Sequence, residues 1–336
     1  MRQIKSLCAW AEVVAAGRRS LLAVALASQG CQCFAAEPAV WLSTLAPVDD
    51  PKNHFQMNGP VDYMELFVNG APWTSAARRT AVFKTSTQFI DHASDEQIRA
   101  MVLGLQARGI LLGLEALMLV PTDRCGRGIE GYGYRGVMDR IAQRILKAGG
   151  VLSFVAFDEP VWYAHWRQGP GLCHDSIEKL AEAMVEPVHA LATAFPLLEF
   201  GTIEPLNNGT NQEFLDDVLR FSKEFQRQTG AILSFIHADL IWQDNWLPQL
   251  TSWRDRIHNA GMQIGVVVDG DPTDKTDIEW AVRAVGRARA LMSDSRIAPD
   301  QYIFQSWGSH PGRLLPEDNE GTMTWIINKA LESTIK

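Results

Sequence analysis

Runs of apolar residues of strand length alternate along the chain with longer segments in which apolar positions recur every three to four residues. The first pattern is typical of buried β-strands and the second of amphipathic helices. Eight runs of the first kind follow one another from Ala39 onward, at residues 40–46, 80–87, 110–119, 151–159, 198–204, 231–239, 262–269 and 301–307. This alternation predicts a parallel sheet in which a helix follows each strand.

Capping boxes mark the start of two of the intervening helices, because a small polar residue is followed three positions later by Gln or Glu. They are Ser94 with Gln97, ahead of a helix predicted at 95–107, and Asp175 with Glu178, ahead of a helix predicted at 176–195. Pro187 lies inside the second helix. Since proline lacks an N–H and clashes with the preceding turn, it should kink or interrupt that helix.

Eight strand–helix units in the residues after 36 match one (β/α)₈ barrel and leave no chain for a second domain. We therefore predict a single α/β domain, a TIM barrel, at residues 37–336. The connection at 48–79 is longer than a strand-to-helix loop requires, so we expect it to form a lid or a collar over one end of the barrel.

Polar residues within the runs fall on one parity of each strand, as a barrel requires when one face meets the helices and the other lines the interior. In the run at 151–159, Ser153 and Glu159 share a face. The same holds for Lys84 with Ser86, Thr202 with Glu204, Gln263 with Asp269, and Gln305 with Trp307. We expect these polar faces to line the barrel interior. The run at 231–239 is ambiguous.

The first 36 residues resemble an export signal. Arg18-Arg19 precede a short apolar stretch, and Phe34-Ala35-Ala36 offers the small residues that a signal peptidase accepts. The arginine pair fits a twin-arginine signal, although an ordinary secretory signal is an equal alternative. The predicted location is therefore periplasmic or secreted. No later stretch offers 18 uninterrupted apolar residues, so we expect no membrane association after signal removal.

Charge and cysteine content narrow the possible partners. The formal net charge is −8, and without the leader, which holds four basic residues and one acidic residue, it is −11. This disfavours a nucleic-acid partner, because phosphate binding needs a basic surface. Cys125 and Cys173 are the cysteines that follow the leader. Both fall in connections at the same end of adjacent strands, so we predict a disulfide that holds the glycine-rich segment 126–136 over the cleft.

Acidic residues close most of the predicted strands. In such barrels the active site lies at the carboxyl ends of the strands. Confined carboxylates raise one another's pKa, and glycoside cleavage requires one protonated and one ionised carboxyl group. The acidic residues at these ends are Glu115, Asp158, Glu159, Glu204, Asp239, Asp269 and Asp271.

Tryptophan is the second indication of a sugar substrate. Six of the 11 tryptophans follow or close strands or lie in the long first connection: Trp73, Trp162, Trp166, Trp242, Trp246 and Trp307. An indole at the mouth offers a flat apolar face to a sugar ring, whereas Trp253, Trp280 and Trp325 lie in helical patterns and are predicted to be core. An acidic, aromatic cleft suits a neutral oligosaccharide and repels an anionic one.

Two short motifs resemble the large retaining glycosidase clan with (β/α)₈ barrels, clan A. Phe157-Asp158-Glu159-Pro160 is similar to the Asn-Glu-Pro motif in which the glutamate is the acid/base, and Ser306-Trp307 is similar to the tryptophan that floors the substrate subsite. The clan's nucleophile is a glutamate that closes the seventh strand, where this chain has Asp269-Gly270-Asp271. The pair Asp158-Glu159 also resembles that of hexosaminidases, which use the substrate's own acetamido group.

The sequence thus favours a glycosidase, acting on a neutral oligo- or polysaccharide, with Glu159 as general acid. Its partner is Glu204, on the neighbouring strand, or Asp269, across the barrel. We expect no cofactor, no catalytic metal and a monomer. The predicted substrate-binding residues are Glu115, Asp158, Trp162, His237, Asp239, Trp242, Gln305 and Trp307.

Two other functions remain open. Glu115, Glu159, Glu204 and Asp239 close consecutive strands, with His237 close by, and four such oxygens can hold a hard divalent ion in a sugar isomerase or lyase. The third possibility is a non-catalytic carbohydrate-binding barrel.

Overall fold

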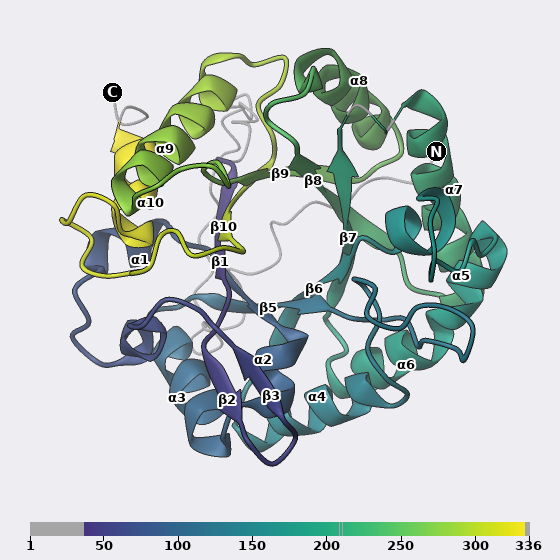
Figure 1. Ribbon diagram of the computed structural model, residues 1–336, viewed down its shortest axis with the longest axis horizontal. Helices are drawn as coiled ribbons and strands as arrows, with labels where there is room; N and C mark the ends of the chain where they lie inside the picture. The colour runs from purple at the N-terminus through teal and green to yellow at the C-terminus, as the bar shows by residue number, and fades with distance from the viewer. Residues whose placement is uncertain (1–36, 208, 210, 333–336) are drawn as a thin grey trace, which may run out of the picture. The chain divides into compact units, whose positions relative to one another are not determined.

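The computed structural model describes residues 37–207, 209 and 211–332. Eight parallel strands close into a barrel in the order β1-β10-β9-β8-β7-β6-β5-β4 (Figure 1). They are β1 (Ala39–Thr44), β4 (Val82–Ser86), β5 (Leu111–Ala116), β6 (Leu152–Asp158), β7 (Glu199–Leu206), β8 (Leu233–Leu240), β9 (Gln263–Val268) and β10 (Gln301–Ser306). Each predicted run overlaps one of these strands, so the prediction of a single (β/α)₈ barrel is confirmed.

Helices surround the barrel on all sides (Figure 1). The predicted helix at 176–195 is divided at Met184 into two helices, in keeping with Pro187 in the first turn of the second one. The helices are α1 (Thr74–Arg79), α2 (Thr87–His92), α3 (Asp95–Gln106), α4 (Val137–Lys147), α5 (Ile177–Ala183), α6 (Val185–Ala194), α7 (Gln212–Thr229), α8 (Trp246–Asn259), α9 (Asp277–Ser293) and α10 (Met323–Leu331).

One of the two predicted capping boxes is present. Ser94 Oγ accepts the N–H of Gln97 at 3.2 Å, and the Gln97 side chain accepts the N–H of Ser94 at 2.9 Å. The second prediction is wrong by one residue, because Ser176 caps α5 by accepting the N–H of Lys179 at 3.2 Å. Asp175 instead accepts from Lys179 Nζ at 2.6 Å.

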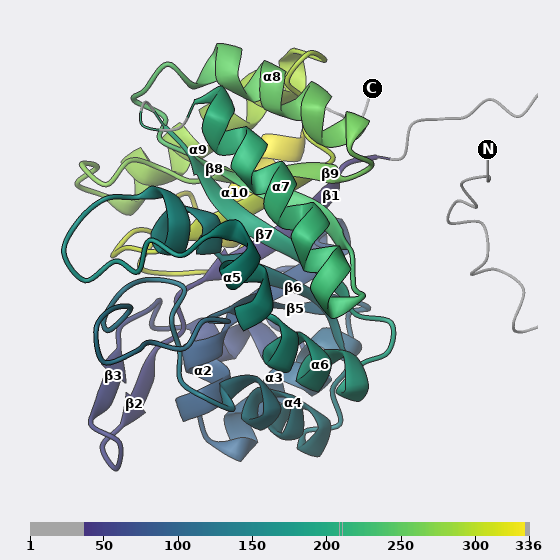
Figure 2. The same ribbon diagram turned by 90° about the vertical axis from the view of Figure 1, so that its right-hand side faces the viewer.

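The long connection after β1 forms a β-hairpin and a buried segment that includes Trp73. The hairpin of β2 (Val48–Asp50) and β3 (Phe55–Met57) packs on α2, where the Phe55 ring stacks on His92 with centroids 3.9 Å apart. Figure 2 shows the hairpin beside α2 at one end of the barrel. Trp73 is fully buried and donates to the carbonyl of Leu66, so its predicted place among the mouth tryptophans is wrong.

The core has an inner and an outer layer. Apolar side chains from seven strands fill the barrel itself, namely Trp41, Val82, Ala156, Ile203, Phe235, Val267 and Ile303. A larger cluster lies between strands and helices, and it contains Trp253 and Trp280 as predicted. Trp325 is half-buried and packs against that cluster.

Of the five predicted interior faces, those of β4, β9 and β10 are right and those of β6 and β7 are wrong. Lys84, on β4, lies on the predicted face, but Val155 and Phe157 of β6 point outward into the helix layer while Ala156 points inward. The pairing of β5 with β6 shifts by one residue and passes over Ser153. On β7, Ile203 faces inward and Thr202 outward. A polar residue therefore does not by itself mark the interior face.

The export signal predicted at 1–36 lies outside the described residues. Within the described part of the chain, no helix is long and apolar enough to cross a membrane. The predicted disulfide between Cys125 and Cys173 is present.

Candidate active site

A cavity of about 290 Å³ lies at the carboxyl ends of the strands, the end at which barrel enzymes carry their active sites. Five carboxylates and three aromatic rings line much of it. The lining residues are Glu115, Glu130, Asp158, Glu159, Trp162, Tyr163, Ile203, Pro205, Asn207, Asp239, Ile241 and Trp307. The structure thus brings together six of the predicted site residues: Glu115, Asp158, Glu159, Trp162, Asp239 and Trp307.

Lys84 supplies the positive charge beneath this cavity. It is fully buried inside the barrel, and its Nζ lies 2.5 Å from Glu115 Oε2. Gln305 Nε2 donates to the same oxygen at 3.0 Å. Gln305 therefore acts on the site through Glu115 and does not itself line the cavity. A buried lysine is stable in its charged form only with such a partner.

Glu159 reaches the cavity through an unusual backbone turn. Alternation would place its side chain on the outer face, opposite Asp158, which faces the interior. The Glu159 φ of 46° lies in the left-handed region, which non-glycine residues adopt mainly at strained functional sites. This turn brings two consecutive carboxylates into one cavity, which an undistorted strand cannot do.

Glu204 holds that turn in place. Its carboxylate accepts the backbone N–H groups of Val161 and Trp162, both at 3.1 Å, and the Thr202 hydroxyl at 3.1 Å. These amides open the π-helical turn Trp162–Trp166, directly after Glu159. Glu204 is fully buried and lies behind the cavity wall, since Ile203 and Pro205 line the cavity and Glu204 does not.

The glycine-rich segment after β5 adds a carboxylate that sequence reasoning missed. Glu130 lines the cavity and accepts the Tyr163 hydroxyl proton at 2.6 Å. Gly131 has a φ of +81°, and a Cβ there would lie 2.5 Å from the carbonyl oxygen of Asp158. The Cys125–Cys173 disulfide ties this segment to the connection after β6. The glycine spacing was the visible signal, and close approach to β6 is its cause.

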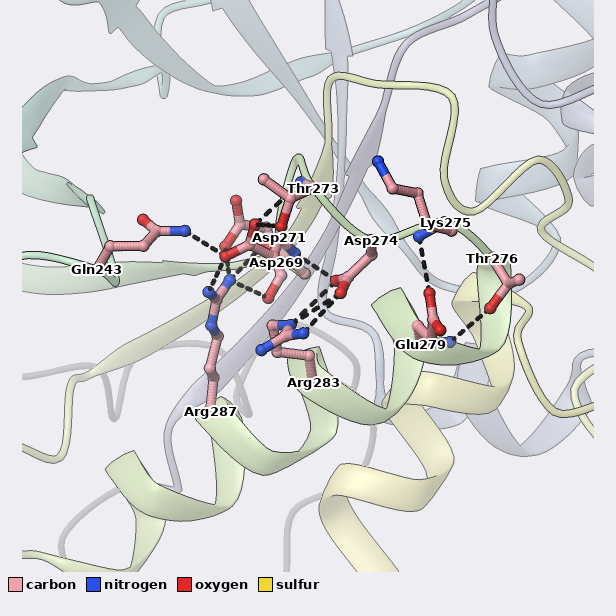
Figure 3. Close-up of polar contacts among 11 residues, drawn as sticks. Gln243, Asp269, Asp271, Thr273, Asp274, Lys275, Thr276, Glu279, Arg283 and Arg287 are labelled. Carbon is pink, nitrogen blue, oxygen red and sulfur yellow. Dashed lines mark hydrogen bonds and ion pairs between the residues drawn. The ribbon is translucent and has the colours of Figure 1, made fainter.

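Asp269, at the end of β9, is held by an arginine. Figure 3 shows Arg287 rising from α9 toward Asp269 and Asp271, with Gln243 reaching Asp271 from the other side. Arg287 Nη1 lies 2.9 Å from Asp269 Oδ1, and Arg287 Nη2 lies 3.5 Å from Asp271 Oδ2. Asp271 also accepts from Thr273 at 2.6 Å. Asp269 does not line the cavity.

Two more predicted binding residues lie away from the cavity. His237 is fully buried inside the barrel, where its Nε2 lies 2.6 Å from Gln301 Oε1 and burial lowers its pKa to about 3. The Trp242 ring lies under Arg287, with the guanidinium carbon 4.9 Å from the ring centroid. His237 lies on β8 and Trp242 follows that strand, but neither side chain lines the cavity.

Burial and mutual repulsion raise the pKa of the cavity carboxyl groups. Burial, together with Asp239 and Asp158, holds the pKa of Glu159 well above its usual range. Burial and the nearby Glu115 do the same for the pKa of Asp158. Burial raises the pKa of Asp239 to about 7, while Lys84 opposes that increase. The site can therefore hold one protonated and one ionised carboxyl group near neutral pH.

The alternative metal-ligand set is not assembled. Glu204 is engaged by backbone amides and His237 lies in the barrel interior, so neither faces Glu115, Glu159 and Asp239 in the cavity. Among residues 37–207, 209 and 211–332, no three His, Cys, Asp or Glu side chains are arranged to hold a metal ion.

Removing Glu204 should destabilise the fold and disturb the Glu159 turn. In Glu204→Ala two buried N–H groups lose their acceptor, which should lower the free energy of unfolding by about 1–3 kcal/mol, as measured by urea denaturation. Glu204→Gln keeps one acceptor oxygen and should cost less. Equal stability of wild type and Glu204→Ala would contradict the role of Glu204 in holding this turn.

The same residue gives a pH dependence of stability. Burial raises the pKa of Glu204 to about 8, against about 4.3 for an unfolded glutamate. A raised carboxyl pKa stabilises the fold below the unfolded value, and this contribution is lost as pH rises through the folded value. Between pH 5 and pH 8, about the range between these values, Glu204→Gln should therefore gain stability relative to wild type. A constant difference would show that Glu204 is not protonated in the folded protein.

Several solved structures share the architecture. The chain is similar to native xylanase 10B from Thermotoga maritima, with a TM-score of 0.50 and 11% identity over 88% of this chain and 95% of the xylanase. It is also similar to a GH10 protein from Paenibacillus barcinonensis (TM-score 0.50, 12% identity, 89% and 96% covered). A third is a GH10 endoxylanase from a sugarcane soil metagenome (TM-score 0.50, 10% identity, 88% and 97% covered).

No family model matches the sequence, and no curated protein does. At 10–12% identity the similarity to the three solved structures establishes a shared barrel fold. The resemblance to the clan A barrels is thus confirmed in architecture.

Proposed function

We propose that this protein is a glycoside hydrolase, with Glu159 as general acid and Asp239 as the partner carboxylate. One observation carries the proposal. Glu159 is only 8% exposed, its carboxyl group has no hydrogen-bond or ion-pair partner among the described residues, and it lines a cavity that it shares with Asp239. An unpaired buried carboxyl group is costly unless it is protonated, and a protonated carboxyl group is what leaving-group departure requires.

The choice of Asp239 over the two partners expected from the sequence follows from their contacts. Glu204 accepts from backbone amides and Asp269 from Arg287, whereas Asp239 has no partner among the described residues and lines the cavity. Among the carboxylates that raise the pKa of Glu159, Asp239 has the largest effect. An ionised Asp239 can activate water or stabilise the positive charge that develops on the sugar.

In this proposal residues 37–336 form the catalytic domain, and the first 36 direct the chain to the periplasm or outside the cell. The Cys125–Cys173 disulfide supports such a location, because disulfides persist in oxidising compartments.

The test is the identity of the product. Purified protein is incubated with a panel of oligosaccharides in ¹⁸O water, and incorporation of ¹⁸O at a new reducing end identifies hydrolysis. Glu159→Gln serves as the inactive comparison. An unsaturated or isomerised product would instead identify a lyase or an isomerase and would overturn the proposal.

Trp307 should form the sugar platform of this site. It lines the cavity and packs on the inner core layer, so its ring is held rigidly. Trp307→Ala should weaken oligosaccharide binding by about 1–3 kcal/mol, measured by calorimetry. Trp242→Ala is the matched control, because Trp242 lies outside the cavity, and it should leave binding unchanged. A loss of affinity in Trp242→Ala, with none in Trp307→Ala, would place the sugar elsewhere.

A further inference from the structure

The cavity holds more carboxylates than glycoside hydrolysis uses. Hydrolysis needs two, whereas five line the cavity: Glu115, Glu130, Asp158, Glu159 and Asp239. No lysine, arginine or histidine is among its lining residues. Lys84, beneath the cavity, offsets one of these charges through Glu115. Beyond the proposed acid and its partner, the cavity thus holds Glu115, Glu130 and Asp158, and Lys84 balances only Glu115.

Most of these carboxylates have unused acceptor capacity directed at the cavity. The carboxyl groups of Glu159 and Asp239 have no hydrogen-bond partner within the described part of the chain, and Glu159 is 92% buried. Glu130 accepts one hydrogen bond, from the neutral Tyr163 hydroxyl. An ionised carboxylate can accept about four hydrogen bonds and a protonated one still accepts, so the cavity has spare acceptors and no cationic donor among its lining residues.

We propose that the substrate of this site is a cationic sugar, a glycan whose residue in the cavity carries a free ammonium group. This inference rests on the proposed function and names its substrate class. An ammonium group supplies three donors together with one positive charge, which no side chain in the lining of the cavity provides. A neutral sugar, as the sequence suggested, would offer Glu130 hydrogen bonds but no opposite charge.

The aromatic residues of the cavity fit the same ligand. Trp162, Tyr163 and Trp307 line it together with the carboxylates. Indole and phenol rings attract cations through their negative faces, and they also pack against the apolar face of a sugar ring. A bare divalent ion would use only the carboxylates. An amino sugar uses both sets of side chains.

Binding of a cation should also change the proton content of the site. The raised pKa of Asp239, about 7, reflects burial and the neighbouring Glu115 and Glu130, so an ammonium group nearby favours its ionised form. Binding of the ammonium form near pH 7 should therefore be accompanied by release of a proton from Asp239.

The experiment compares ligands that differ only in charge. Oligomers of glucosamine and of galactosamine, each with its fully N-acetylated counterpart, are titrated into the protein by calorimetry near pH 6.5, at about 50 mM and about 500 mM NaCl. We expect the amine form to bind at least about tenfold more tightly than the acetylated form at low salt, with a smaller difference at high salt. Hydrolysis of each oligomer is followed in parallel.

Glu130→Gln tests whether the cavity carries the preference. It removes one charge, keeps the side-chain shape, and should lower the preference for the amine form about threefold to tenfold. Glu182→Gln, at an exposed position of α5, is the matched control and should retain the full preference.

Three results would overturn the inference: equal or tighter binding of the acetylated oligomers, no binding of the amine forms at millimolar concentrations, or displacement of a bound amine by stoichiometric Mg²⁺ or Ca²⁺. A failure of the proposed function can be distinguished from a failure of this inference. Amine preference without hydrolysis would leave the ligand class standing and remove the hydrolase, while hydrolysis of neutral oligomers without amine preference would do the reverse.

Discussion

Glu159→Gln is expected to lower kcat/KM on glycosides with a poor leaving group by about 10²–10⁴-fold. The amide keeps the shape of the side chain, but it has no proton to give to the departing oxygen. An aryl glycoside with an acidic leaving group needs no such proton, so its loss should be far smaller. Initial rates on one substrate of each kind, with the same sugar, provide the measurement.

The pH profile supplies an independent readout of the same residue. Activity requires ionised Asp239, whose pKa is about 7, and protonated Glu159, whose pKa is held well above its usual range by burial and by Asp239. Wild-type activity should thus rise through about pH 7 and fall again at higher pH. The alkaline fall should be absent in Glu159→Gln assayed on the activated substrate.

Glu182→Gln is the control for both measurements, because it makes the same chemical change at an exposed position outside the cavity. It should leave the rates and the pH profile unaltered. Equal losses on both substrates in Glu159→Gln would contradict its role as proton donor and would indicate a nucleophile or a binding group.

The barrel could be predicted because its signal is repeated eight times. Each strand needs a short apolar run and each helix a longer amphipathic one, so an error in one element does not alter the count. It was harder to predict which side chains of an individual strand point into the barrel. Ser153 is passed over in the pairing of β6, which reverses the alternation, and nothing in the local sequence marks such a shift.

The site could be predicted only where strand order alone decides position. Asp239 and Trp307 lie at the mouth because β8 and β10 end there. Glu204 also lies near the carboxyl end of a strand, β7, but the amides of Val161 and Trp162 bind its carboxylate, and these come from a different connection. Glu130 belongs to an irregular segment whose position depends on a disulfide and a glycine, so no strand pattern indicates it.

Removing the disulfide should have the largest effect on stability. Cys125 and Cys173 close a loop with a sequence separation of 48 residues. The chain-entropy relation for a loop of this length gives about 4 kcal/mol, which the double variant Cys125→Ser/Cys173→Ser should lose relative to wild type. Thermal unfolding should shift downward by about 6 °C for a chain of this size.

The disulfide should also affect the cavity, because its loop carries Glu130 and the glycine that approaches β6. Without the bond, the Glu130 side chain is held by the Tyr163 hydroxyl, at 2.6 Å, and its segment by backbone hydrogen bonds between Leu119 and Gly131. We therefore expect KM to increase in the double variant more than kcat decreases, since Glu204 holds the turn that carries Glu159 and Asp239 lies on β8. Wild type treated with a thiol reductant should reproduce both changes. An unaltered KM together with the full loss of stability would show that the loop keeps its place over the cavity without the bond.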